Sequence, residues 1–394
     1  MHSIASTPRT LRLFAVSIVA RVPEAMFSIA LLVHARHLTG SFAAAGVVSG
    51  AYAVGLGVSG PVLGRLVDRR GQAAILIAAA AASTVLLVSI ALLPVGAPVA
   101  VIVLLAGAIG LASPPVGACV RALYPGLAAD SAALRATYAA DASASELTWI
   151  AGPPAALALG ALWSTAAALI AGGVVLLVAT VAFAVQPASR AWRPDPAATS
   201  TRGGSLRAPA MRTLVVVFVA VGALFGAAEV AVTGAADALG STTAAAPLLG
   251  LWGAGSLVGG VLSARFGRGT PSLTLVLGAL AAGHLALAAA AGSLVALAVV
   301  LFLAGAAIAP TYATVYALVD EAAPAGAVTE AFAWLVTAVA VGGAVGSAVA
   351  GGVVDGAGPA AAFVVAGGCG VVAVVTALLR ARTLGGPVPA PAAA

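Results

Sequence analysis

Long apolar runs, separated by short polar turns, occupy almost the whole chain. A membrane-spanning helix needs about 20 apolar residues, because each residue advances about 1.5 Å through a hydrocarbon layer of about 30 Å. Twelve runs are long enough to span a bilayer. The predicted spans are 11–33, 43–63, 73–94, 98–121, 140–163, 165–186, 213–235, 243–264, 272–291, 293–317, 329–353 and 359–380. A transmembrane barrel would show short alternating segments instead, and the abundant Gly and Ala favour close helix packing.

Composition agrees with this pattern. Of the 394 residues, 62% are hydrophobic and 8% are charged, whereas a soluble domain is about half apolar and about one quarter charged. A water-soluble fold would expose much of that apolar surface. The sequence therefore predicts an all-α integral membrane protein in contact with the lipid bilayer.

The distribution of basic residues predicts the orientation. There is no Lys, and nearly all of the 18 basic residues fall on one side of the predicted spans, which the positive-inside rule makes cytoplasmic. Only Arg36 falls outside, and Arg21 lies within a span. We expect a multi-pass protein of the cell (inner or plasma) membrane with both termini cytoplasmic, whose net charge of +6 reports topology rather than nucleic-acid binding. The inner side collects Arg9, Arg12, Arg65, Arg69, Arg70, Arg121, Arg135, Arg190, Arg193, Arg202, Arg207, Arg212, Arg265, Arg268, Arg380 and Arg382.

The chain divides into two related halves. A polar segment, 187–211, separates a six-helix bundle at 1–186 from another at 212–394, and it lacks the apolar surface to fold alone. Gly40-Ser41 after the first span recurs as Gly240-Ser241 after the seventh. Parallel repeats of this kind occur in transporters, with the substrate site between the halves.

The most specific motif lies between the second and third spans. Gly64, Asp68, Arg69 and Gly71 resemble the loop signature of the major facilitator superfamily, and a copy at 260–267 has lost the acid. We interpret the motif as a conformational latch, in which Asp68 meets the N-terminus of a facing helix and Arg69 pairs with a neighbour. The alternative is a solvated turn on the positive side of the membrane.

The fifth predicted span carries a second resemblance. Gly152, Pro153 and Pro154 are similar to the Gly-Pro signature of exporters in this superfamily. Proline removes a backbone donor and kinks a helix, and small neighbours allow close approach, here expected to a helix of the other half. An ordinary kinked helix is the alternative interpretation.

The resemblance covers nearly the whole chain and implies a fold and a function. It implies twelve transmembrane helices in two pseudo-symmetric six-helix bundles, around a cavity lined by helices 1, 4, 7 and 10. It further implies secondary active transport by alternating access, with proton-coupled export of a small organic compound as the expected activity.

Charged residues inside spans are the best candidates for the site, because each is costly in a bilayer. Arg21 and Glu24 share one face of the first span, as a structural ion pair or as a binding site. Glu229, with no basic residue near it on its own helix, is the first candidate for proton coupling, since desolvation favours its neutral form. Glu24 is the second candidate and Glu146 a further one, whereas Glu330 lies too near a span edge to count.

Other side chains are weaker candidates. Tyr312 and Tyr316 share a face of the tenth span and could stack on a substrate. His284 is expected to be a packing or satisfied histidine. Arg121, near Tyr124 at the end of the fourth span, is expected to snorkel to the interface.

Several alternatives stay open at this stage. An importer, a uniporter or a non-transporting membrane sensor would fit the same spans. An intramembrane enzyme would need paired catalytic residues, which are not evident, and Cys119 and Cys369 suggest neither a disulfide nor a metal site. We therefore expect no catalytic residue, no metal and no cofactor, and a monomer whose partners are a small-molecule substrate and the proton.

Overall fold

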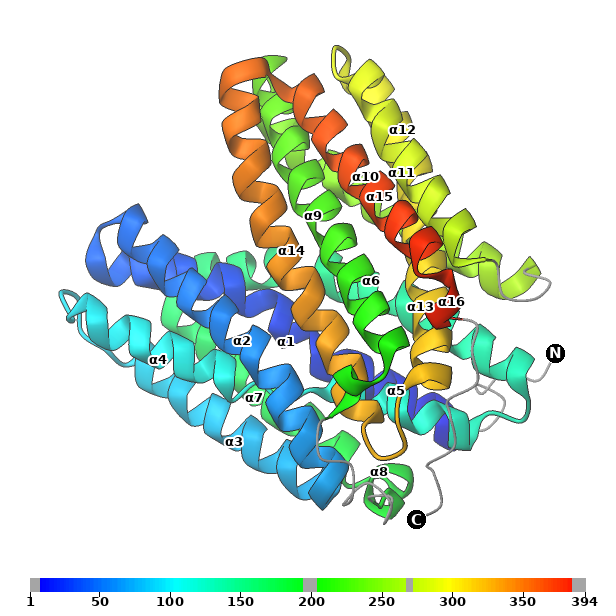
Figure 1. Cartoon of the computed structure of the whole chain (residues 1–394). Coiled ribbons are helices and arrows are strands. Elements are labelled where there is room, and N and C mark those ends of the chain that lie inside the picture. Colours follow the sequence, from blue (N-terminus) through cyan, green and yellow to red (C-terminus); the bar gives the residue numbers. More distant parts are fainter. Residues whose placement is uncertain (1–7, 194–203, 267–271, 385–394) are drawn as a thin grey trace.

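The computed structural model describes residues 8–193, 204–266 and 272–384, and in these ranges the regular structure is helical throughout (Figure 1). The predicted inter-half segment contributes two short elements, α8 and η3, and its residues 194–203 lie outside the described ranges. The elements are α1 (Pro8–Thr39), α2 (Phe42–Arg70), α3 (Gln72–Ala91), α4 (Val99–Leu111), α5 (Val116–Leu127), α6 (Ser131–Leu162), α7 (Thr165–Ala184), α8 (Pro187–Ala191), η3 (Ser205–Arg207), α9 (Pro209–Ala238), η4 (Thr242–Ala244), α10 (Ala245–Phe266), α11 (Leu273–Ala290), α12 (Leu294–Gly305), α13 (Ile308–Ala322), α14 (Val328–Ala357), α15 (Pro359–Leu379) and α16 (Ala381–Leu384).

Eleven segments of the described residues are long and apolar enough to cross a membrane. The twelfth helix of the fold is α6, which is 32 residues long and carries the charged residues Arg135, Asp141 and Glu146. Two predicted spans, 98–121 and 293–317, are each built from two helices, α4 with α5 and α12 with α13. Pro114 and Pro115 separate the first pair, because proline has no amide hydrogen to continue the helix.

Equivalent turns end the first helix of each half. Gly40 follows α1 with φ +69°, and Gly240 follows α9 with φ +70°. Glycine adopts this left-handed conformation without steric cost, so it is favoured after the last turn of a helix. Ser41 then caps α2, its Oγ accepting a hydrogen bond from the backbone N–H of Ala44 at 3.3 Å.

The two halves repeat one packing scheme. In the first half α1 packs on α6 and α7, α2 packs on α4, and α3 packs on α7. In the second half α9 packs on α14 and α15, α10 packs on α12, and α11 packs on α15. Each relation in the second half reproduces one in the first, so the sequence repeat corresponds to a structural repeat.

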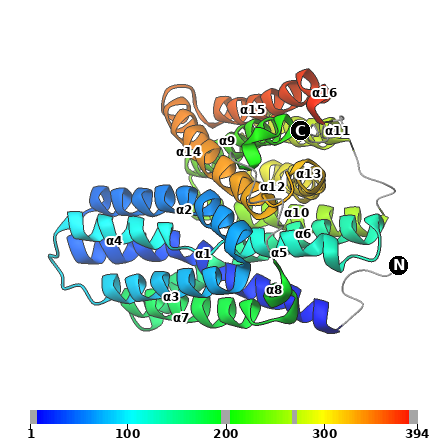
Figure 2. The ribbon, with the colours of Figure 1, turned by 60° about the horizontal axis from the view of Figure 1, so that its bottom comes forward.

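The halves meet along one part of their length and diverge beyond it. Across the junction α2 packs on α14, and α6 packs on α10 and α13 (Figure 2). A Cβ added to Gly57 or Gly60 of α2 would contact α14, whereas one added to Gly46 or Gly50 on the same face would have no atom within 4 Å. The two helices therefore touch only over the half of α2 that ends at Arg70, and Figure 1 shows the bundles splayed apart at the other end.

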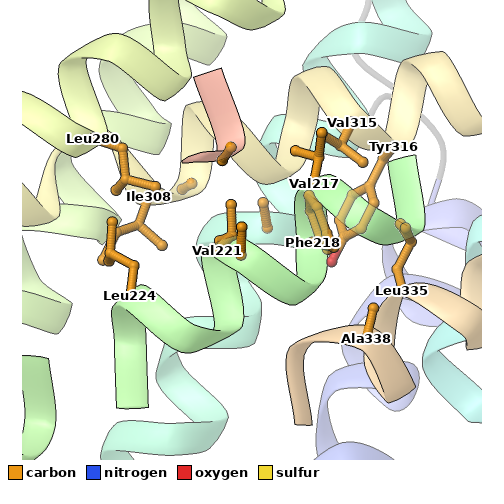
Figure 3. Packing of buried hydrophobic residues seen from close by; sticks show 14 of the residues in the cluster. Val217, Phe218, Val221, Leu224, Leu280, Ile308, Val315, Tyr316, Leu335 and Ala338 are labelled. Atoms are coloured by element: carbon orange, nitrogen blue, oxygen red, sulfur yellow. The ribbon is translucent and has the colours of Figure 1, made fainter. Parts of the chain in front are cut away.

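Helix α9 lies at the centre of the second half. Its residues Val217, Phe218, Val221 and Leu224 are fully buried. Figure 3 shows these side chains packed with Leu280 of α11, Ile308 and Val315 of α13, and Leu335 of α14. Glycines on α9 and α14 bring their backbones together: a Cβ on Gly222 would approach the Val339 carbonyl, and one on Gly346 would approach that of Ala223.

Candidate functional site

Asp68, near the end of α2, caps a helix of the opposite half. Its Oδ1 accepts a hydrogen bond from the backbone N–H of Thr329 at 3.1 Å, and its Oδ2 accepts one from Glu330 at 2.8 Å. These donors belong to the first turn of α14, where backbone N–H groups have no partner within the helix. The carboxylate is 1% exposed, and a negative charge at a helix N-terminus is favourable. The contact predicted for Asp68 is therefore present.

The arginine of this contact is Arg65, and the expectation that Arg69 pairs with a neighbour is wrong. Arg65 forms a bidentate pair with Glu330, with Nε to Oε2 at 3.1 Å and Nη2 to Oε1 at 2.8 Å. Arg69 is exposed, and no partner is present for it among the described residues. Arg69 lies one helical turn further along α2 than Arg65, and only Arg65 contacts Glu330. Glu330, set aside in the sequence analysis, is buried in this contact, where Trp334 Nε1 also donates to it at 3.3 Å.

Glycines make this close approach possible. A Cβ on Gly64 would lie 3.0 Å from the Glu330 Cα, so a larger residue would push α14 away. Gly71 has φ +96° and connects α2 to α3. Further along α2, the Thr337 hydroxyl donates to the Gly57 carbonyl at 2.6 Å. The two motif glycines are thus explained locally: Gly64 by the close approach of α14, and Gly71 by its positive φ.

A second cluster of charges is buried inside the first half. Arg21 Nη2 lies 2.7 Å from Asp141 Oδ1, and Arg121 Nε lies 2.7 Å from Asp141 Oδ2. The Tyr124 hydroxyl donates to Asp141 Oδ1 at 2.9 Å, and Arg21 Nη1 donates to Ser145 at 3.0 Å. Asp141 is fully buried, and the two arginines are 7% and 5% exposed. One carboxylate therefore connects α1, α5 and α6.

This cluster corrects two expectations. Arg21 does not pair with Glu24 but with Asp141, and Arg121 does not snorkel to the interface but is buried against the same carboxylate. Sequence reasoning missed Asp141 because it lies at the second residue of the predicted span 140–163, and α6 in fact begins at Ser131. A helix boundary placed earlier would have marked Asp141 as a charge inside a span.

Aromatic rings join this cluster to the second half. The Arg121 guanidinium carbon lies 4.2 Å from the ring centroid of Tyr316, on α13. Tyr138 of α6 lies 6.1 Å from Tyr316 and 6.1 Å from Phe332 of α14. Tyr312, one turn before Tyr316, lies 5.8 Å from it. The two candidate tyrosines therefore line the junction between the halves.

Well away from the helix ends, three carboxylates of the described spanning helices form no ion pair: Glu24, Glu146 and Glu229. Glu24 is half-buried and lies within electrostatic range of Arg21 and Arg121, both of which are held by Asp141. Glu146 is half-buried near the middle of α6, close to Ser256 of α10.

The side chain of Glu229 reaches the surface of the protein. It lies one turn after Phe225 on α9, and Thr233 and Asp237, four and eight residues further on, are exposed as well. Residues four apart share a helix face, so these three form a polar stripe. Lipid would disfavour such a stripe, which indicates that this face of α9 meets water.

Gly152 performs its packing role within its own half, so the expected approach to the other half is wrong. A Cβ at Gly152 would lie 2.7 Å from the Ala25 Cβ on α1. Helix α6 continues through Pro153 and Pro154 to Leu162. The glycine thus sets the distance between α6 and α1 next to Glu24.

The chemistry available here is that of charge and proton binding. In the part of the chain that the structure describes, no group of three or more His, Cys, Asp or Glu residues is placed to hold a metal ion. The arrangement offers carboxylates that can titrate, arginines held in fixed positions, and aromatic faces along a junction between two helical bundles.

Comparisons with known proteins agree with the fold. The family model of the Major Facilitator Superfamily matches residues 13–259 and 220–393. No curated protein matches the chain in sequence. The human organic anion transporter MFSD10 (TETRAN) superposes with a TM-score of 0.72 at 16% identity, covering 94% of this chain and 99% of that chain.

Two other solved structures are similar to the same extent. The proton:xylose symporter XylE has a TM-score of 0.70 at 15% identity, covering 94% of this chain and 95% of that chain. The E. coli fucose:proton symporter FucP has a TM-score of 0.70 at 16% identity, covering 94% and 98%. At these identities the likeness concerns the fold alone. With the family model spanning both halves, the chain belongs to the major facilitator superfamily and is a membrane transporter rather than an enzyme.

Proposed function

We propose that the protein is a proton-coupled exporter of a small organic compound that works by alternating access. The observation that carries this proposal is that three carboxylates well away from the helix ends, Glu24, Glu146 and Glu229, have no ion-pair partner among the described residues. A carboxylate without a fixed partner can take up and release a proton as its surroundings change.

Glu229 and Glu24 are the proposed proton sites. Glu229 lies on the polar stripe of α9, where water can deliver a proton. Glu24 lies deeper, beside Arg21 and Arg121, where the Asp141 carboxylate neutralises one of the two arginine charges. Loss of the Glu24 charge leaves the Arg21–Asp141–Arg121 cluster intact, so Glu24 can titrate without breaking an ion pair.

Alternating access is proposed to depend on the contact between α2 and α14. The latch consists of Gly64, Arg65, Asp68 and Gly71, with Arg65 as the arginine that reaches α14. Both termini are proposed to be cytoplasmic, which makes the latched end the cytoplasmic one and the conformation outward-facing. Rocking of the halves would break the latch and open the cytoplasmic side.

Export is the proposed direction, supported by the Gly-Pro pattern at Gly152, Pro153 and Pro154. Proton symport is the alternative, favoured by the names of two similar structures, which are proton symporters. Both modes use the same carboxylates, and the direction of substrate flux relative to the proton gradient separates them.

The test is a flux assay with purified protein in proteoliposomes of known orientation. A panel of small organic compounds is loaded, a pH gradient is imposed, and proton movement is followed with a trapped pH-sensitive dye. We expect at least one compound to leave the cytoplasmic side while protons move in the opposite direction. Co-movement of compound and protons would establish symport, and flux that ignores the pH gradient would overturn proton coupling.

Variants locate the coupling site in the same assay. Glu229→Gln should abolish accumulation driven by the pH gradient but retain exchange down a substrate gradient, since the amide fills the same space without titrating. Asp355→Asn is the matched control, because Asp355 is an exposed acid near the far end of α14. Equal gradient-driven accumulation by both variants would remove Glu229 from the coupling mechanism.

A further inference from the structure

Four buried polar atoms of the second half have no hydrogen-bond partner among the described residues, and three of them lie on α10 and α11: Trp252 Nε1, Ser256 Oγ and His284 Nε2, the fourth being Thr329 Oγ1 of α14. Trp252 and Ser256 lie four residues apart on one face of α10, and the His284 ring of α11 lies 5.6 Å from the Trp252 ring. An unpaired buried polar atom costs about 1–3 kcal/mol. Buried atoms of this kind are satisfied by a bound ligand or by water.

The state of the histidine follows from its one hydrogen bond. His284 Nδ1 lies 2.7 Å from the Leu280 carbonyl oxygen, which can only accept, so Nδ1 carries the hydrogen. The neutral ring then presents a bare lone pair at Nε2. His284 is therefore only half satisfied, and the expectation of a satisfied packing histidine holds for one of its two nitrogens.

Aromatic rings surround these atoms. Phe225 of α9 meets the Trp252 ring edge to face, with centroids 5.5 Å apart, and is stacked with Tyr312 of α13 at 6.3 Å. Phe225 and Tyr312 are half-buried, whereas Ser256 and His284 are fully buried. Phe225 and Tyr312 are thus the more exposed members of this group.

A carboxylate faces this group from the other half. Glu146 of α6 lies close to Ser256 and within electrostatic range of Tyr312, and it forms no ion pair among the described residues. The two arginines buried in the spanning helices, Arg21 and Arg121, are both held by Asp141. Neither arginine pairs with Glu146, so the ionised Glu146 carboxylate would attract a cation.

We propose that Glu146, Trp252, Ser256 and His284, with the rings of Phe225 and Tyr312, bind the cationic amine group of the substrate. Ammonium N–H groups donate to the carboxylate, to the His284 lone pair and to the Ser256 hydroxyl, while aromatic faces attract the positive charge. Trp252 Nε1 donates to an oxygen atom of the same substrate. The predicted substrate class is a small amine that carries a hydroxyl or carbonyl oxygen.

This inference names the substrate of the proposed transporter, so it rests on the proposed function. It also explains how the substrate contacts both halves at once: Glu146 lies on α6 of the first half, and the other five residues lie on α9, α10, α11 and α13 of the second. A ligand held from both sides of the junction changes the relative stability of the conformations, as alternating access requires.

The test is calorimetric binding to the purified full-length protein, with tyramine as probe and 4-ethylphenol as its analogue without the amine. We expect tyramine to bind and 4-ethylphenol to bind at least 10-fold more weakly. Glu146→Gln should weaken tyramine binding about 10-fold or more, and Glu146→Asp should restore part of it. Asp355→Asn, at an exposed acid near the far end of α14, should bind tyramine like the wild type.

Each result decides the inference. Tyramine affinity unchanged in a folded Glu146→Gln protein, or equal affinity for both compounds, overturns it. Loss of tyramine binding in Ser256→Ala and in His284→Phe, with the thermal stability of the protein retained, supports it. Gradient-driven flux only of neutral or anionic compounds would refute the amine site and leave the proposed transport standing. Amine binding without flux would refute transport and leave the site standing.

Discussion

The sharpest perturbation of the junction is Asp68→Asn. The carboxylate accepts from two N–H groups of α14, and it carries the charge that the helix N-terminus favours. An asparagine keeps one acceptor oxygen but turns an amide N–H₂ group toward the second donor. The lost charge and the lost hydrogen bond together are worth about 1–2 kcal/mol. That corresponds to a shift of about 5–30-fold in the equilibrium between latched and unlatched states.

The conformational equilibrium can be measured directly. Spin labels at Val95, in the turn after α3, and at Ala357, at the far end of α14, report the separation of the halves at the end away from the latch. We expect Asp68→Asn to move the distance distribution toward shorter values and to slow transport, while expression and substrate binding stay close to those of the wild type.

The structure also predicts which arginine matters. Arg65→Gln should shift the distribution in the same direction but less, because the Arg65 side chain is 48% exposed and an exposed ion pair contributes about 0.2–1 kcal/mol. Arg69→Gln is the matched control and should leave the distribution unchanged. Unchanged distances and transport rates in a well-expressed Asp68→Asn protein would refute the latch, and a larger effect of Arg69→Gln than of Arg65→Gln would refute the assigned contact.

Four further outcomes follow from the contacts. Glu24→Gln should leave thermal stability unchanged, since Arg21 is paired elsewhere, and a large loss of stability would show that Glu24 holds the arginine after all. Asp141→Asn, which leaves two buried arginines without a full counter-charge, should cost about 3–5 kcal/mol and appear as a lower melting temperature. Gly152→Val should lower stability by forcing α6 away from α1, whereas Gly160→Val, with no neighbour within 4 Å, should not. Ala191→Cys, in α8, should react with an impermeant thiol reagent only from the cytoplasmic side, and labelling of intact cells would reverse the topology.

The fold was largely predictable because its signals are local. Each spanning helix is recorded as a run of apolar residues of bilayer length, and the turns after α1 and α9 repeat as Gly40-Ser41 and Gly240-Ser241. The breaks between α4 and α5 and between α12 and α13 were missed, because hydropathy stays high across them. Pro114 and Pro115 marked the first break in the sequence, but two prolines change the average hydropathy of a span only slightly.

The site was less predictable because its contacts join residues far apart in the chain. Arg65 and Glu330 are 265 positions apart, so the motif alone did not reveal which of two arginines faces α14. The same holds for Arg21, whose nearest acid in sequence, Glu24, shares its helix face, while its actual partner, Asp141, lies 120 positions away. Spacing along one helix predicts which side chains share a face; the partner that a neighbouring helix supplies depends on packing.

The strengths of these contacts suit a protein of two rigid halves. Within the first half, Asp141 ties three helices together through fully buried ion pairs, and breaking such a pair costs about 3–5 kcal/mol. Between the halves, the latch contributes a helix cap and one half-exposed pair, together about 1–3 kcal/mol. Thermal fluctuation or the binding of a ligand can break the latch between the halves while the Asp141 ion pairs within the first half stay intact. The ion pairs of Asp141, which are the costliest to separate, therefore lie within one half of the protein. The Arg65–Glu330 pair, which must separate in each transport cycle, lies at the junction between the halves.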